Sequence, residues 1–93
     1  MKTLEDKILE CPYCGFDCLH QVGVEVFERN EDEEKGVHSW TRGTGVSVDT
    51  DISRNPSSRR QGVLIHFWCE GCDRVSSLSI SQHKGNTFFN YKL

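Results

Sequence analysis

The sequence predicts a mainly β fold, built as one small antiparallel sheet. Three observations support this prediction. Apolar residues alternate with polar ones in several short segments, as they do in strands that bury one face. Only 35% of the 93 residues are hydrophobic and 27% are charged, so we expect a core too small to stabilise the chain alone. The chain also has five cysteines, and four of them stand in two C-x2-C pairs.

The first element predicted is short. Residues 1–10 can form about two turns of helix, because Thr3 and Asp6 have the spacing of a capping box and apolar residues follow on one face. After the first cysteine pair, the valines of residues 22–26 stand at every second position. This alternation predicts a strand whose valine face is buried.

Polar connections and a second strand pattern follow. Residues 30–36 (NEDEEKG) are charged and predict a solvated hairpin loop. Alternating valines in residues 46–48 favour a strand, and Gly43 and Gly45 just before it indicate a bulge or bend. Residues 53–62 (SRNPSSRRQG) predict a flexible loop, because serine, arginine and proline dominate them.

The strongest strand pattern is GVLIHFWC, residues 62–69, in which odd-numbered side chains share one face and even-numbered side chains the other. Residues 75–82 are predicted as its return partner. A turn at 84–86 and a last strand over 87–92 complete the chain. We expect a single domain spanning residues 1–93, with no internal repeat besides the two cysteine pairs.

The cysteine pairs predict a metal site, because two thiolates from one tight turn can point at the same ion and two turns complete a tetrahedron. Pro12 fixes a backbone angle in the first turn, and Gly15 can take a positive φ that aims backbone N–H groups at sulfur. In the second pair Gly71 lies inside the turn, and Asp73 stands where the first pair has glycine. Aspartate tolerates the left-handed region better than most residues. The expected ligands are Cys11, Cys14, Cys69 and Cys72.

CPYCG and CEGCD, each beside a strand, resemble the paired knuckles of the zinc-ribbon group (the rubredoxin-like double zinc knuckle), whose short stand-alone bacterial and phage members have no assigned role. The resemblance covers the knuckles and their flanking strands, roughly half the chain. It implies one structural Zn²⁺ between two β-hairpins and a sheet of zinc-ribbon type. Residues 15–68 separate the knuckles, whereas compact ribbons separate them by about 15–20 residues. We therefore expect an extended β insertion.

Other interpretations of the cysteines remain open. Redox C-x-x-C chemistry, disulfides and rubredoxin-like iron are each less favoured than zinc, because the pairs suit closed four-coordinate binding and the second knuckle lacks a proline and trailing glycine. Cys18 is expected to be a small buried hydrophobe. Cys18 or His20 as a metal ligand is a less favoured alternative. Since four thiolates leave no open metal position, we expect no enzyme activity.

The expected role is binding, with nucleic acid slightly ahead of protein as the target. The net charge of −3 argues against a globally basic surface but is compatible with a local basic patch. Cations for phosphates and aromatic rings for base stacking define the candidate patch. Its residues are Arg54, Arg59, Arg60, His66 and Trp68. The alternative is a protein-interaction module of a larger complex, in which the arginines decorate a solvated loop and the tryptophan packs on the sheet.

The sequence also suggests where the protein works. No apolar run is long enough to cross a bilayer, and the charged N-terminal residues lack the apolar segment of a signal peptide. We expect a cytoplasmic protein whose thiols stay reduced, with no membrane and no small-molecule substrate as partner.

Overall fold

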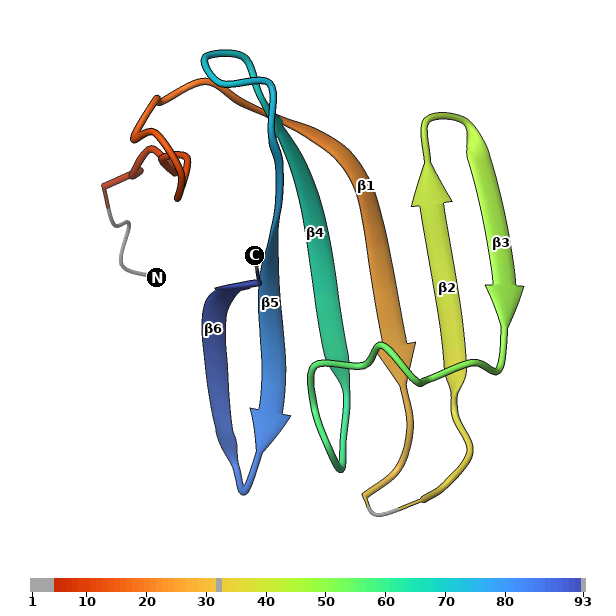
Figure 1. Cartoon of the computed structure of the whole chain (residues 1–93). Coiled ribbons are helices and arrows are strands. Elements are labelled where there is room, and N and C mark those ends of the chain that lie inside the picture. Colours follow the sequence, from red (N-terminus) through yellow and green to blue (C-terminus); the bar gives the residue numbers. More distant parts are fainter. Residues whose placement is uncertain (1–4, 32, 93) are drawn as a thin grey trace.

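The computed structural model describes residues 5–31 and 33–92 (Figure 1). Its six strands form one antiparallel sheet in the order β3-β2-β1-β4-β5-β6, which confirms the predicted mainly β fold. The strands are β1 (Leu19–Glu28), β2 (Val37–Arg42), β3 (Gly45–Asp49), β4 (Gly62–Cys69), β5 (Val75–His83) and β6 (Asn86–Lys92). Residues 5–10 of the predicted N-terminal helix are irregular, and residues 1–4 lie outside the described residues.

The insertion between the knuckles forms most of the sheet. β1, β2 and β3 are joined in sequence order as a meander, and residues 50–61 then carry the chain back across the sheet to β4, which pairs with the free side of β1 (Figure 1). A tight turn at Gly43 and Thr44 joins β2 to β3, in place of the bulge or bend expected there. Gly43 has a φ of 60°, a conformation that glycine adopts without a steric penalty.

One face of the sheet, the covered face, lies beneath residues 50–61. Paired residues of an antiparallel ladder share a face, and Glu25 is paired with Leu64 on this one. Glu25, Phe27 and Leu64 are only 1%, 0% and 6% exposed. The covering segment makes direct contact: an Arg54 guanidinium nitrogen donates to Glu25 at 2.6 Å, and the Gly62 Cα lies so close to Pro56 that an added Cβ would be 2.8 Å from the proline ring.

The opposite face, the apolar face, carries aliphatic and aromatic side chains from all six strands. Its members are Val24, Val26, Val37, Val46, Val48, Val63, Ile65, Leu78, Ile80 and Phe89. The three members nearest the sheet edges, Val46, Val48 and Phe89, are 70%, 65% and 78% exposed. No second sheet or helix packs on this face within residues 5–31 and 33–92.

The expected burial of the valine face in β1 is therefore wrong for the chain by itself. Gly23, Glu25 and Phe27 are the buried residues of β1, whereas Val24 and Val26 are half-buried. The predicted alternation is present in β1, but residues 50–61, the crossing segment, cover the face that carries Glu25 rather than the valine face. Local periodicity cannot show this, because the crossing segment is distant in sequence from β1.

Candidate metal centre

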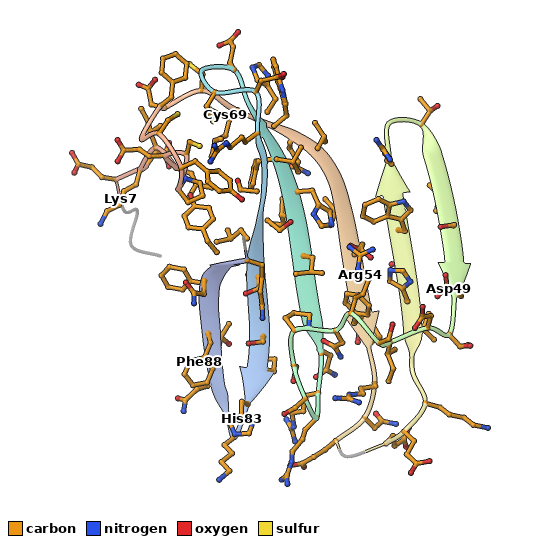
Figure 2. The ribbon with its side chains drawn as sticks, in the orientation of Figure 1. Lys7, Asp49, Arg54, Cys69, His83 and Phe88 are labelled. Carbon is orange, nitrogen blue, oxygen red and sulfur yellow. The ribbon has the colours of Figure 1, made fainter. Side chains whose placement is uncertain are left out.

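Four cysteine sulfurs gather at the end of the sheet where β1 begins and β4 ends (Figure 2). Cys11, Cys14, Cys69 and Cys72 place their Sγ atoms within 4.8 Å of one another. Cys11 Sγ lies 3.7 Å from Cys72 Sγ, and Cys14 Sγ lies 3.6 Å from Cys69 Sγ. A tetrahedron with Zn–S bonds of about 2.3 Å has S···S edges of about 3.8 Å. The cluster therefore has the size of a four-thiolate metal site and fits a zinc-ribbon-like centre.

The first knuckle is a tight turn closed by backbone hydrogen bonds. Cys11 N–H donates to Phe16 O at 2.8 Å, and Gly15 N–H donates to Cys11 O at 2.9 Å. Tyr13 N–H lies 3.4 Å from Cys11 Sγ, the type of contact that stabilises a thiolate ligand. Gly15 has a φ of 79°, which confirms the predicted left-handed position after the second cysteine of the pair.

The second knuckle repeats this construction. Cys69 N–H donates to Arg74 O and Asp73 N–H donates to Cys69 O, both at 2.9 Å. Asp73 has a φ of 59°, so aspartate occupies the left-handed position that glycine holds in the first knuckle, as the sequence indicated. The Asp73 carboxylate accepts a hydrogen bond from the Trp68 indole N–H at 2.5 Å, which anchors the turn to β4.

Two contacts between the knuckles were not predicted. An added Cβ on Gly71 would lie 2.8 Å from Phe16 Cγ, so the second knuckle needs glycine at this position to accommodate the phenyl ring of the first. The Arg74 guanidinium lies 4.9 Å from the centre of the Tyr13 ring, a cation–π distance. The aromatic residues two positions after Cys11 and Cys14 were the available signal, but their partners are far away in sequence.

The thiols of the cluster have unequal proton affinities. Burial raises the pKa of Cys11, but N–H groups of Cys14 and Tyr13 and the nearby thiols outweigh it, and the pKa falls to about 7. Burial, together with the adjacent sulfurs of Cys69, Cys11 and Cys14, raises the pKa of Cys72 to about 12. Four adjacent thiolates repel one another, so full deprotonation requires a cation among them.

The fifth cysteine lies outside the cluster. Cys18 is exposed, and its Sγ lies 3.6 Å from an Asp17 carboxylate oxygen. The expectation that it is buried is wrong, because β1 begins only at Leu19 and strand parity does not extend to residue 18. His20 is also absent from the cluster of described ligands. Its ring lies 5.4 Å from that of Trp68, and its Nε2 lies 3.8 Å from a Glu70 carboxylate oxygen.

The three arginines of the candidate nucleic-acid patch lie in the segment that crosses the covered face. Arg54 is paired with Glu25 at 2.6 Å, and Arg60 is paired with Glu31 at 2.8 Å. Arg59 is exposed, and its backbone N–H lies 3.4 Å from Ser57 Oγ. The acidic connection between β1 and β2 therefore lies beside the arginine segment, an arrangement that opposes phosphate binding.

The other two residues of the candidate patch, His66 and Trp68, do not lie together with all three arginines. His66 points into the covered face, where its Nε2 lies 2.7 Å from Glu25 and its Nδ1 lies 2.6 Å from Ser77 Oγ. Trp68 is six residues beyond Gly62 on β4, about 20 Å along the strand. Only Arg54 and His66 converge, and they converge on the same carboxylate.

Glu25 is the centre of a buried polar cluster that sequence analysis missed. Besides Arg54 and His66, His38 places its Nε2 2.9 Å from the carboxylate, and the His38 Nδ1 lies 2.9 Å from Asp49. Burial lowers the pKa of His38, but its hydrogen bonds to Asp49 and Glu25 outweigh the burial and raise it. The one sequence signal was a carboxylate standing between Val24 and Val26 in a strand pattern.

Comparisons of the chain with protein-family models, with curated proteins and with solved structures found no match. Within the part of the chain that the structure describes, no helix is long and apolar enough to cross a membrane. The support for a metal site at the four cysteines therefore comes from the distances between their Sγ atoms.

Proposed function

We propose that the four cysteines hold one structural Zn²⁺ and that the chain acts as a binding module rather than an enzyme. Zinc prefers tetrahedral sulfur coordination, and four thiolates close its coordination sphere. A closed site activates no water, so the ion contributes to folding and not to chemistry. The ligating residues would be Cys11, Cys14, Cys69 and Cys72, whose sulfur spacing matches such a tetrahedron.

The apolar face favours protein over nucleic acid as the partner. Its aliphatic and aromatic side chains come from all six strands; they are exposed in β2, β3 and β6 and half-buried in β1, β4 and β5. Contiguous apolar surface of this kind marks interaction sites. Nucleic-acid binding depends instead on cations available to phosphates. Arg54 and Arg60 are each paired with a carboxylate, which weakens the case for the arginine segment.

The zinc assignment is tested by native mass spectrometry and elemental analysis of protein purified without added metal. We expect one zinc per chain, four displaced thiol protons and no disulfide. Cys69→Ser should lose the zinc, whereas Cys18→Ser, the matched control outside the cluster, should retain it. Bound iron, or cysteines oxidised in pairs, would contradict the assignment.

The choice of partner class is tested by two measurements. Single-stranded DNA and RNA should show no mobility shift at about 50 mM salt, where electrostatic binding is strong. A shift that weakens on combined Arg59→Ala and Arg60→Ala substitution would restore nucleic acid as the target. A photo-reactive amino acid in place of Val48, on the apolar face, should form protein adducts in the expressing cell. The same group in place of Ser47, on the covered face, should not.

A further inference from the structure

We propose that the apolar face is covered by the apolar face of a second copy of this chain, so that two sheets pack face to face as a symmetric dimer. This inference rests on the proposed function, in which that face binds protein, and it names the partner.

Within residues 5–31 and 33–92, the fold has no second layer of secondary structure. Stable domains pack two or more layers of secondary structure around a core, whereas this chain supplies one sheet whose covered face lies under a connecting segment. Phe27 and Leu64 are the buried apolar side chains of that face. On the opposite face, Val24 and Val26 of β1 have the alternation of a buried strand face and remain half-buried. A second sheet would provide the burial that their alternation predicts.

The charge distribution favours self-association through this face. The ten members of the apolar face are uncharged, and among the other described strand positions that share the face, Glu28 at the end of β1 is the one charged residue. Away from Glu28, two such faces meet without repulsion or buried charge. The acidic excess of the chain, −3 in total, lies on other surfaces, where like charges oppose contact between two copies.

The width of the face indicates a sheet as its partner. Six strands spaced about 4.8 Å apart span about 25 Å. A single helix, about 10 Å across, would cover less than half of that width. A second six-stranded sheet has the same width, and aligned sheets pack about 10 Å apart with their strands rotated by about 30°.

The area of the face is of the same order as that of a stable dimer interface. At about 3.3 Å per residue along each strand, the face has a flat area on the order of 500 Å², and side-chain relief increases the accessible surface beyond this. Standard interfaces bury about 800 Å² per partner, and homodimer interfaces are richer in apolar area than other contacts. Among the described residues before the first knuckle, residues 5–10, the contact with this face is at its knuckle end, where the Tyr91 hydroxyl donates to Glu10 O.

The test is the mass of the zinc-loaded chain in solution, measured by light scattering and native mass spectrometry between about 1 and about 100 µM. We expect twice the chain mass of 10.7 kDa. Val48→Glu should weaken the dimer at least tenfold, because it places a carboxylate in the interface. Ser47→Glu is the matched control: it introduces the same charge one residue away in β3, on an exposed position of the opposite face, and should leave the dimer intact.

Circular dichroism and zinc content are measured on both variants to show that they fold. A wild-type chain that stays monomeric at about 100 µM overturns the dimer, while adducts formed at position 48 with a different protein would still support the proposed function. A dimer equally stable in Val48→Glu and Ser47→Glu also overturns the inference, because it would have to form through a surface other than the apolar face. Loss of dimer in Val48→Glu alone supports it.

Discussion

Glu25 is the residue whose environment is most unusual in this chain. A buried carboxylate is costly unless its oxygens are paired and hydrogen-bonded. Here Arg54, His38 and His66 all contact it, and they come from the crossing segment, β2 and β4. The cluster therefore links three separate parts of the covered face through one side chain, and its loss would affect all of them.

Glu25→Ala should reduce the free energy of unfolding by about 3–5 kcal/mol, the cost of removing one partner from a buried charge cluster. Urea denaturation of the zinc-loaded protein measures the change. Glu28→Ala is the control, because Glu28 is an exposed carboxylate of the same strand and its removal should change stability by no more than about 0.5 kcal/mol. Equal losses in the two variants would mean that the cluster contributes no specific stability.

His38 should make stability depend on pH near neutrality. Its folded pKa is raised above 6.5 by Asp49 and Glu25, so the protonated ring contributes stability that is complete below pH 6.5 and is lost as the pH rises through the folded pKa. The other charged groups near it are Asp51 and Arg54, and the His66 ring shares the Glu25 carboxylate with it. From about pH 6 to about pH 8, the melting temperature of the wild type should fall relative to that of His38→Gln. Parallel melting curves would contradict this contribution.

At this scale the sequence predicted which four cysteines lie together and did not predict the polar cluster. The C-x2-C spacing determines the knuckle geometry locally, so even the left-handed Asp73 could be anticipated from its position after Cys72. The partners of Glu25 lie between 13 and 41 residues away. No local pattern encodes such contacts, and for the same reason the sequence grouped Arg54 with Trp68 rather than with Glu25.

Among the elements, hairpins are predictable and the crossing segment is not. The turn at Lys84 and Gly85 was predictable because glycine favours turns. Both residues have positive φ values. Residues 50–61 carry a loop composition, yet they provide the cover of one sheet face. Ser57 is buried within this segment and donates from its hydroxyl to Gln82 O at 2.7 Å. Composition indicated a loop but could not indicate what the loop contacts.

Gly62→Ala tests the close contact between this segment and the start of β4. An added Cβ would lie 2.2 Å from Asn55 Oδ1 and 2.8 Å from the Pro56 ring. The amide oxygen is held by Ser57 N–H at 3.0 Å and the ring is rigid, so the segment must move. We expect a loss of about 1–3 kcal/mol of stability in urea denaturation. Gly45→Ala, where the nearest atom is a backbone oxygen at 3.4 Å, is the control and should lose less.

For the whole molecule, the metal site and the sheet depend on each other through one strand pair. Leu19 of β1 is paired with Cys69 of β4, so the ion would join the start of one central strand to the end of the other. The overall β class was predicted from the alternation of apolar residues, and the gathering of four cysteines was predicted from their spacing. The single-layer architecture was not, because it follows from a strand order that places β4 beside β1 across 33 intervening residues (29–61).

Removing zinc should therefore destabilise the whole chain and not only the knuckles. Structural zinc sites supply on the order of 10 kcal/mol of apparent binding energy, which is comparable to the total stability of a small domain, about 5–15 kcal/mol. Chelation with EDTA should lower the melting temperature and reduce the β signal in circular dichroism, and re-addition of zinc should restore both. Amide hydrogen exchange should show protection lost first in residues 11–18 and 69–74, where the knuckles lie. Cys18→Ser, which retains the cluster, should respond to EDTA as the wild type does. A chelated protein with an unchanged spectrum and melting temperature would mean that the sheet folds without the ion, and the cysteines would then need a role other than structural support.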